Sequence, residues 1–436
     1  SEMCIRDRPE AERLALNGLS STPCGMRAYQ PLGDLILDFD DLSTDADCYK
    51  RSLDLETGSL NVRFIVGNAH YERETFISYP DGVLVLRVSV DSPQGLSLRC
   101  RLNRKRCEKA GHLDNSTTYF TGNSNGIRYA AAVRLAEYDG GTSRVVGDTV
   151  LLCGVKSAVF LLAAATTYRE TFPLQAVTSC LNNAAKQSYD ELKKRHLDYI
   201  CKNFSTCHLN LASDWTLERL PTDVRLKYAA TQADPGLDAL YFQYGRWLLF
   251  AASRPGSLPA NLQGIWNDSF FPPWDSKFTI NINTEMNYWP AAVCGLASCE
   301  EPLFDLLARM VPNGQHTAQE MYGCRGFVAH HNTDLWGDTD PQDRYLPASF
   351  WPMGAAWLCT HIWRYYLYSC DVQFLRSRFT ILEQAVLFFI DFLEQDEDGF
   401  YVTNPSVSPE NTYILPSGVH GNLCIGSTMD LSLIHI

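Results

Sequence analysis

The sequence predicts a multidomain α+β protein in which an antiparallel β-sandwich precedes a helical domain. The chain has 436 residues, 45% of them hydrophobic, whereas a single hydrophobic core stops growing near about 250–300 residues. Apolar residues recur with a period of two from about residue 27 to 170 and with a period of 3.6 from about residue 222. The first period is typical of half-buried strands and the second of amphipathic helices. The change of period therefore separates two kinds of domain.

Alternating apolar residues identify the strands. The clearest runs lie at 35–39, 60–66, 84–90, 96–102 and 127–135, with turn signals such as Pro80-Asp81-Gly82 between them. Several half-buried strands at short spacing favour an antiparallel β-sandwich. We place this domain at residues 9–180, and its start is predicted to be incomplete.

A linker and a helical domain are predicted next. The linker, residues 181–221, combines a charged helix over 181–200 with a short strand near 207–211. The helical domain, residues 222–430, contains helical periodicity at 240–251, 357–366 and 379–392. Long connections rich in Trp, Asn, Asp, His and Pro join these helices, and such aromatic loops are poor candidates for disorder. We therefore expect the chemistry in these loops, on a helical scaffold.

The two ends of the chain differ from the remainder. Residues 1–8 and 431–436 resemble translated adapter sequence, and we leave both out of the fold prediction. On this interpretation the natural gene extends past both ends, and the lack of a signal peptide does not argue against export. The location stays open, with a secreted or periplasmic protein among the alternatives.

The composition argues against binding to nucleic acid or to a membrane. The chain has 50 acidic and 37 basic residues, for a formal net charge of −13, and has no block of five Lys or Arg. A polyanion requires a compensating basic surface. The longest apolar stretches, such as 158–165, fall well short of the roughly 20 residues that span a bilayer.

The first loop, residues 261–290, has the composition of a sugar site. It contains five Asn and three Trp, and an extended backbone would direct Asn281 and Asn283 to the same side, where their amides could hold one hydroxyl or one water. Uncharged amides beside indole rings suit a neutral polyol. We assign Gln263 and Trp266 of this loop to substrate binding. The alternative is that the Asn side chains bond loop backbone and the Trp rings fill the core.

The second loop, residues 326–338, contains His330, His331, Asp334 and Trp336. The His and Asp spacing invites a zinc hypothesis, but no third ligand occurs at a familiar spacing. We expect no metal and no other cofactor here. A hydrogen-bonding wall of the substrate site is the favoured interpretation of these four residues.

The third loop, residues 404–411, ends in Glu410, which follows a segment that contains two prolines. A carboxyl group held with little freedom and partly desolvated in a closed sugar pocket could act as a general acid. The alternative, equally compatible with the sequence, is that Glu410 caps a following helix.

Four motifs occur in a fixed order: Leu-Gln-Gly-Ile-Trp-Asn at 262–267, Asn-Ile-Asn-Thr-Glu-Met-Asn-Tyr-Trp-Pro at 281–290, Gly-Phe-Val-Ala-His-His-Asn-Thr-Asp-Leu-Trp-Gly at 326–337 and Pro-Ser-Val-Ser-Pro-Glu-Asn at 405–411. Together they resemble glycoside hydrolase family 95, the inverting α-L-fucosidases that act on terminal fucose. Strings at 31–35 and 71–76 resemble the N-terminal β-sandwich of the family. The resemblance covers about residues 25–430.

The resemblance implies an (α/α)6 barrel behind the β-sandwich, no metal, and a fucosylated oligosaccharide as substrate. By motif, Glu410 would be the general acid, and Asn281 and Asn283 would position the attacking water. The general base of the family is an Asp in the later part of the barrel. Asp430 matches an earlier position of the family and is not assigned as the base. We therefore expect an incomplete barrel that lacks its base, and an inactive fragment.

Two alternatives to a fucosidase remain. Another (α/α)6 sugar enzyme, such as a phosphorylase, would need basic residues or a Gly/Ser-rich loop near the acid to bind phosphate. The 404–421 segment contains no basic residue except His420. The other alternative is a non-catalytic carbohydrate-binding protein.

Overall fold

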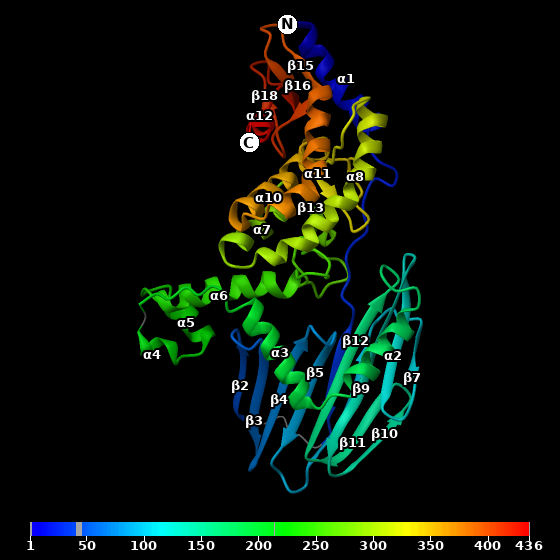
Figure 1. The fold of residues 1–436 in the computed structure, drawn as a ribbon, viewed down its shortest axis with the longest axis vertical. Helices are drawn as coiled ribbons and strands as arrows, with labels where there is room; N and C mark the ends of the chain where they lie inside the picture. The colour runs from blue at the N-terminus through cyan, green and yellow to red at the C-terminus, as the bar shows by residue number, and fades with distance from the viewer. Residues whose placement is uncertain (1, 41–45, 213, 436) are drawn as a thin grey trace. The chain divides into compact units, whose positions relative to one another are not determined.

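The computed structural model describes residues 2–40, 46–212 and 214–435. The chain divides into two compact units. The sandwich unit comprises residues 32–208, and the helical unit comprises the residues up to Pro31 together with those from Leu209 onward. Figure 1 shows strands gathered in the first unit and helices in the second. This confirms the predicted fold class.

The sandwich unit contains two antiparallel sheets. Within its described residues, the smaller sheet has the order β1-β6-β11-β10 and the larger β2-β3-β4-β5-β12-β9-β8-β7. The strands are β1 (Asp34–Phe39), β2 (Asp47–Asp54), β3 (Ser59–Val66), β4 (Ala69–Ser78), β5 (Val83–Val90), β6 (Leu96–Asn103), β7 (Lys109–His112), β8 (Thr117–Ser124), β9 (Ile127–Asp139), β10 (Thr142–Val146), β11 (Thr149–Val155) and β12 (Ser157–Thr166). All five predicted strands are present.

Strand β12 shows why the apolar run at 158–165 is continuous instead of alternating. Ala158 and Phe160 belong to the core between the two sheets, whereas Val159 and Leu161 belong to a second core on the other face of the larger sheet. Since successive strand residues point to opposite faces, a central strand that is covered on both faces must be apolar at every position.

Helices α2 (Pro173–Ala184) and α3 (Tyr189–Asn203) pack against the sandwich unit. Val177, Leu181 and Leu192 lie in the second core with strand residues of the larger sheet. The single helix predicted over 181–200 is therefore two helices. Ser188 begins the second with a capping box, in which its side chain and that of Glu191 bond each other's backbone amides.

The strand predicted near residues 207–211 is wrong. This segment has no strand, and residues 208–211 are exposed. A strand requires a neighbouring ladder to satisfy its backbone groups, and the apolar alternation of this short segment does not supply one.

The helical unit is built from helices joined by long irregular segments. Its longer helices are α1 (Glu2–Gly18), α6 (Pro235–Ala252), α7 (Asn283–Val293), α8 (Glu301–Tyr322), α10 (Gly354–Ser369), α11 (Val372–Phe392) and α12 (Thr428–His435). Short helices are α4 (Trp215–Glu218), α5 (Thr222–Tyr228), η1 (Pro273–Ser276), η2 (Ala297–Glu300) and α9 (Leu346–Ser349). Short strands are β13 (Phe278–Thr279), β14 (Asn332–Thr333), β15 (Leu393–Gln395), β16 (Tyr401–Thr403), β17 (Ser406–Val407), β18 (Tyr413–Ile414), β19 (His420–Gly421) and β20 (Leu423–Cys424). The helices predicted at 240–251, 357–366 and 379–392 are confirmed.

The segment before residue 32 belongs to the helical unit, although residues 9–31 were predicted as part of the β-sandwich. Leu16 and Leu19 pack on a cluster that contains Leu346 and Val407, and the Tyr29 amide donates to the Asp275 carbonyl over 2.9 Å. Polar-apolar alternation in the sequence could not reveal this, because these contacts join residues that are far apart along the chain.

Backbone hydrogen bonds join the first loop, the second loop and helix α10. The Ile280 amide donates to the His331 carbonyl over 2.7 Å, and the Gly354 amide donates to the Ala329 carbonyl over 3.1 Å. Strands β13 and β14 pair beside them. Gly354, the first residue of α10, has no side chain to separate the helix from this backbone. The first and second loops and helix α10 are therefore tied to one another.

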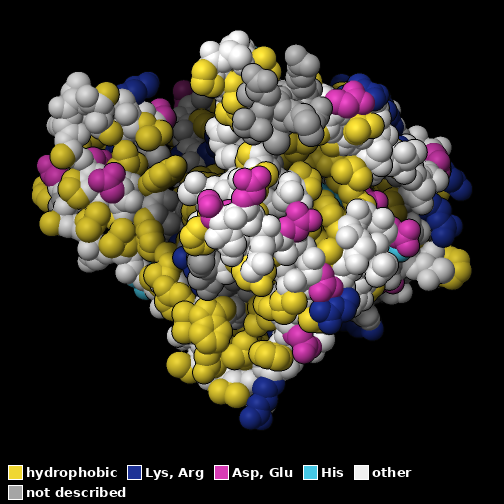
Figure 2. Space-filling view, turned by 90° about the horizontal axis from the view of Figure 1, so that it is seen from above, with side chains coloured by type: hydrophobic (Ala, Val, Ile, Leu, Met, Phe, Trp, Pro, Cys, Tyr) yellow, Lys and Arg dark blue, Asp and Glu magenta, His cyan; other side chains and the backbone are white. Residues whose placement is uncertain are grey.

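Hydrophobic side chains also reach the surface. Figure 2 shows broad hydrophobic patches that carry few charged side chains. Trp363 and Leu367 on α10 and Val386 and Ile390 on α11 are among the exposed large apolar residues. Patches of this kind are typical of interaction surfaces. None of the helices in the described part of the chain combines the length and hydropathy that crossing a bilayer would require.

We expect Gly354→Ala to lower the free energy of unfolding by about 1–3 kcal/mol, as overpacking does. An added Cβ would lie 2.5 Å from the His330 carbonyl oxygen and 2.9 Å from Ile280 Cδ1. Gly245→Ala in α6 is the matched control, because an added Cβ there meets nothing within 4 Å. It should raise the free energy of unfolding by about 0.5–1 kcal/mol. Urea unfolding followed by circular dichroism measures both, and equal effects would contradict the proposed close approach.

Candidate active site

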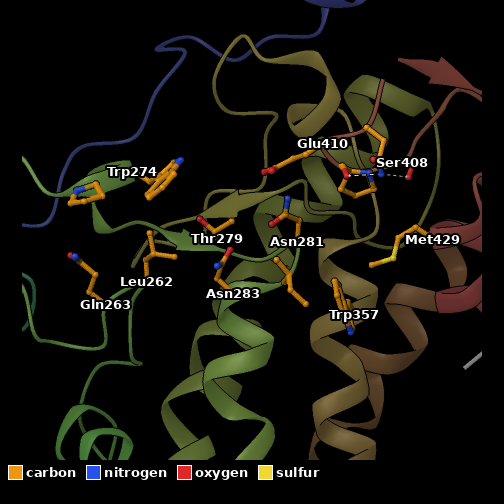
Figure 3. Close-up of a pocket in the computed structure, with 14 residues that line it drawn as sticks. Leu262, Gln263, Trp274, Thr279, Asn281, Asn283, Trp357, Ser408, Glu410 and Met429 are labelled. Carbon is orange, nitrogen blue, oxygen red and sulfur yellow. Dashed lines mark hydrogen bonds between the residues drawn. The ribbon is translucent and has the colours of Figure 1, made fainter. Parts of the chain in front are cut away.

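One pocket of about 670 Å³ in the helical unit brings together residues of the first and third loops. This volume is in the usual range for small-molecule sites, about 300–1,000 Å³. Figure 3 shows Asn281, Asn283 and Glu410 around it. The lining residues are Leu262, Gln263, Pro273, Trp274, Thr279, Asn281, Ile282, Asn283, Trp357, Ser408, Pro409, Glu410, Asn411 and Met429. The second loop supplies no lining residue, but supports the floor through β14 and the Ile280–His331 hydrogen bond.

Asn281 and Asn283 line the pocket from different backbone conformations. The extended backbone expected at Asn281 and Asn283 is wrong, since Asn281 lies in a turn and α7 begins at Asn283. Thr284, Tyr288 and Ala291 are buried, and their spacing of four and three residues is that of one helix face. Burial of this helix face favours a helix over an extended backbone from Asn283 onward. The side chains of Asn281 and Asn283 nevertheless both line the pocket.

Unpartnered polar atoms accompany the asparagine pair. Among the described residues, neither the Asn281 Oδ1 nor the Thr284 Oγ1 has a hydrogen-bond partner, and the same holds for both carboxyl oxygens of Glu285. Glu285 is fully buried, and this burial raises its pKa well above the ordinary value. Burial therefore favours the neutral form of this carboxyl group.

The third loop presents Glu410 with a constrained backbone. Glu410 has φ of 59°, in the left-handed region that non-glycine residues seldom adopt, and its amide donates to the Pro347 carbonyl over 2.9 Å. No helix follows directly; β18 is the next element, so the helix-capping alternative is wrong. The Glu410 side chain is exposed, unlike the partly desolvated carboxyl group expected from the sequence. Strained backbone of this kind clusters at functional sites.

Asp430 holds the start of the third loop in place through hydrogen bonds. It is fully buried and accepts hydrogen bonds from Trp351 Nε1 at 3.0 Å and from the hydroxyls of Thr403 and Ser406, each at 2.7 Å. Burial raises the pKa of Asp430, and these hydrogen bonds oppose the rise. Its oxygens are engaged in holding β16, β17 and α12 together, so Asp430 is occupied by structural hydrogen bonds.

The lining of the pocket is almost uncharged. Of its described lining residues, only Glu410 carries a formal charge, and none is Lys or Arg. Three asparagines, one glutamine, one serine and one threonine supply uncharged hydrogen-bonding groups near it, beside the indole rings of Trp274 and Trp357. The arrangement suits a neutral polyhydroxy ligand with one acid group directed at it.

The residues predicted to bind substrate are only partly at the pocket. Gln263 lines it, whereas Trp266 does not and is half exposed elsewhere on the first loop. Trp336 is also exposed outside the pocket lining. Asp334 accepts hydrogen bonds from the backbone amides of Trp336 and Asp338, and so organises the second loop itself.

The two histidines of the second loop are buried in the scaffold. His330 Nδ1 donates to the Thr339 carbonyl and its Nε2 accepts from the Tyr322 hydroxyl, both over 2.7 Å. Burial lowers the pKa of His330 to about 4, so its ring is neutral. His331 Nε2 lies 3.3 Å from the Asp343 carboxylate. In the described ranges no group of His, Cys, Asp or Glu has the arrangement of a metal site.

Several pocket residues were missed by sequence reasoning. Trp274, Thr279, Trp357, Ser408 and Met429 line the pocket. Helical periodicity placed Trp357 among the core residues of a helix. In the structure it lies near the start of α10 and lines the pocket. The density of aromatic residues in the first loop is the signal that could have identified Trp274.

We expect Glu285→Gln to change the pH dependence of stability. The unfolded chain releases the Glu285 proton above about pH 4.5, whereas the folded chain retains it because its pKa is raised. The free energy of unfolding of the unsubstituted chain should therefore fall with rising pH, by up to about 1.4 kcal/mol per pH unit. Glu285→Gln should equal the unsubstituted chain at pH 4 and exceed it at pH 8, as measured by urea unfolding.

The control for this test is Glu320→Gln, at an exposed position of α8, which should keep the pH dependence of the unsubstituted chain. A Glu285→Gln variant that is less stable than the unsubstituted chain at pH 8 would mean that the carboxylate is ionised and paired.

Comparison with known proteins gives the family. Residues 188–436 match the glycosyl hydrolase family 95 catalytic domain, and residues 2–171 match the glycosyl hydrolase family 65 N-terminal domain. Among solved structures, one named as a kojibiose phosphorylase from human microbiome has a TM-score of 0.62 at 11% identity, over 86% of this chain and 51% of that chain. At this identity the likeness concerns the fold alone.

Curated relatives agree with the family match. Alpha-L-fucosidase 2 of Arabidopsis thaliana is 35% identical over 93% of this chain and 53% of its own length. Probable alpha-fucosidase A of Aspergillus niger is 34% identical over 88% of this chain and 52% of its own length. The chain thus spans about half the length of these relatives. With a family 95 match over more than half of its residues and curated relatives that are 35% and 34% identical, this chain belongs to glycoside hydrolase family 95.

Proposed function

We propose that this chain is part of an enzyme that removes terminal α-L-fucose from oligosaccharides or glycoconjugates by single-displacement, inverting hydrolysis. The observation that carries the proposal is the pocket that Glu410 of the third loop lines together with Asn281 and Asn283 of the first loop. The names of the curated relatives, both fucosidases, supply the sugar.

Glu410 is the proposed general acid. A glycosidic bond breaks readily only if the leaving oxygen is protonated as it departs. Glu410 is the one carboxyl group in the described lining of the pocket, and its left-handed backbone and the Pro347 hydrogen bond limit where it can point. It therefore donates its proton to the oxygen that links fucose to the next sugar.

Asn281 and Asn283 are the proposed holders of the attacking water. In an inverting reaction the water attacks the anomeric carbon from the face opposite the leaving group. Amide oxygens can accept hydrogen bonds from this water and orient it, but an amide cannot take its proton at useful pH. The reaction consequently requires a second carboxylate, and the pocket lining in the described part of the chain contains none besides Glu410.

We further propose that the general base lies outside this chain and that the chain alone is inactive. Asp430 is already engaged by Trp351, Thr403 and Ser406, and Glu285 is fully buried and does not line the pocket. Both are thereby poor candidates for the base. A phosphorylase is less well supported, because the described pocket lining offers no Lys or Arg to bind phosphate.

We expect a form of the protein extended to the length of its relatives to release fucose, with the β-anomer appearing first in proton NMR. Glu410→Gln in this form should lower the rate on a fucosylated oligosaccharide by about 10²–10⁴, the usual contribution of a positioned acid. An aryl fucoside with an acidic leaving group should lose much less, because its leaving oxygen needs little protonation.

Glu397→Gln is the control, since Glu397 is an exposed carboxylate outside the pocket, and both substrates should be cleaved as by the unsubstituted enzyme. Equal losses on both substrates in Glu410→Gln would remove Glu410 as the proton donor. An unsubstituted extended enzyme that releases no fucose, or releases the α-anomer first, would contradict the proposed reaction.

A further inference from the structure

Trp274 is displayed at the pocket in an unusual way. The residue is 78% exposed and yet lines the pocket. In Figure 3 it lies on the side away from Ser408 and Met429, and the Glu410 side chain extends toward that side. A large indole ring in water forgoes the favourable burial of its apolar surface, so its exposed position requires an explanation.

The backbone around Trp274 is strained. Trp274, Asp275 and Ser276 have φ of 47°, 57° and 53°. Three consecutive non-glycine residues in the left-handed region are rare, and each costs free energy that the surrounding structure must offset. The turn is therefore imposed by its surroundings and not by local preference.

Hydrogen bonds of the helical unit hold this turn from several directions. The Asp275 carbonyl accepts from the Tyr29 amide over 2.9 Å, and the buried Ser276 hydroxyl donates to Asn261 Oδ1 over 3.1 Å. The buried Lys277 ammonium lies 3.4 Å from the Asp343 carboxylate. The indole ring thus projects from an anchored backbone. A rigid aromatic surface loses little conformational entropy when a ligand stacks on it.

The position relative to Glu410 indicates which part of a substrate Trp274 would meet. The general acid protonates the leaving oxygen, so the sugar that follows fucose must lie on the side of the Glu410 carboxyl group. This is the side to which Glu410 extends in Figure 3, where Trp274 stands. Pyranose rings have an apolar face that packs on an indole ring, while their hydroxyls face water or polar side chains such as Gln263.

We propose that Trp274 forms a second sugar subsite, on which the pyranose that carries the terminal fucose stacks. This inference rests on the proposed function and adds the leaving-group side of the substrate to it. The subsite selects glycans in which fucose is joined to a further sugar over fucosides with small aglycones.

The test is calorimetric titration of the 436-residue chain with three ligands: a trisaccharide that bears terminal α-L-fucose, the corresponding disaccharide without fucose, and free L-fucose. Trp274→Ala should weaken trisaccharide binding about five- to tenfold, as expected for the loss of one aromatic stacking contact, and change L-fucose binding less than twofold. Trp274→Gly should do the same while relieving the left-handed strain, which separates loss of the ring from loss of the turn.

Phe271→Ala is the matched control. Phe271 is 77% exposed on the same loop but does not line the pocket, and its replacement should leave all three affinities unchanged. If the Trp274 variants weaken fucose and trisaccharide equally, or weaken neither, the subsite is refuted.

The same titrations can refute the proposed fucose specificity separately from the sugar subsite. If the unsubstituted chain binds the disaccharide as well as the trisaccharide and loses both through Trp274→Ala, the sugar subsite stands and the fucose assignment falls. If the unsubstituted chain binds none of the three ligands, both proposals are overturned.

Discussion

The hydrogen bond from the Ile280 amide to the His331 carbonyl is the contact on which the site depends. It continues the β13–β14 pair and fixes the backbone immediately before Asn281. Two further carbonyls of the segment 329–347 accept hydrogen bonds: the Ala329 carbonyl from the Gly354 amide and the Pro347 carbonyl from the Glu410 amide. Residues 329–347 thus tie together the Asn281 segment, helix α10 and the Glu410 loop, although none of these residues lines the pocket.

Burial assigns different tasks to the carboxyl groups of the helical unit. Asp430 is buried and hydrogen-bonded to three side chains, so it organises the loop that leads to Glu410. Glu285 is buried without a hydrogen-bond partner for its carboxyl oxygens among the described residues, and this burial raises its pKa. Glu410 alone among the three reaches the pocket with an exposed side chain. A charged or proton-donating group that must meet substrate has to remain accessible, whereas structural carboxyl groups need not.

The sequence was sufficient where a local period or a motif carried the information. Alternation located β5 and β9, and helical spacing located α6, α10 and α11. It failed where distant contacts decide the outcome. Thr284 and Tyr288 are buried on one face of α7, and this burial favours a helix that begins at Asn283. Hydrogen bonds to Tyr322 and Thr339 hold the His330 ring in the scaffold, outside the pocket lining. Trp274 escaped detection because a backbone held by Tyr29 and Asn261 exposes its ring. These interactions join residues far apart in the chain, which periodicity does not record.

The central claim is that one sugar ring fits between the amides of Asn281 and Asn283 and the Glu410 carboxyl group. A crystal structure of the chain soaked with an iminosugar of fucose configuration tests it most directly, because the ligand ammonium mimics the positive charge that develops on the sugar ring. The account predicts a ligand that contacts both amides on one face and Glu410 on the other. A well-ordered ligand bound elsewhere, or in this pocket without contact to Glu410, would contradict the account.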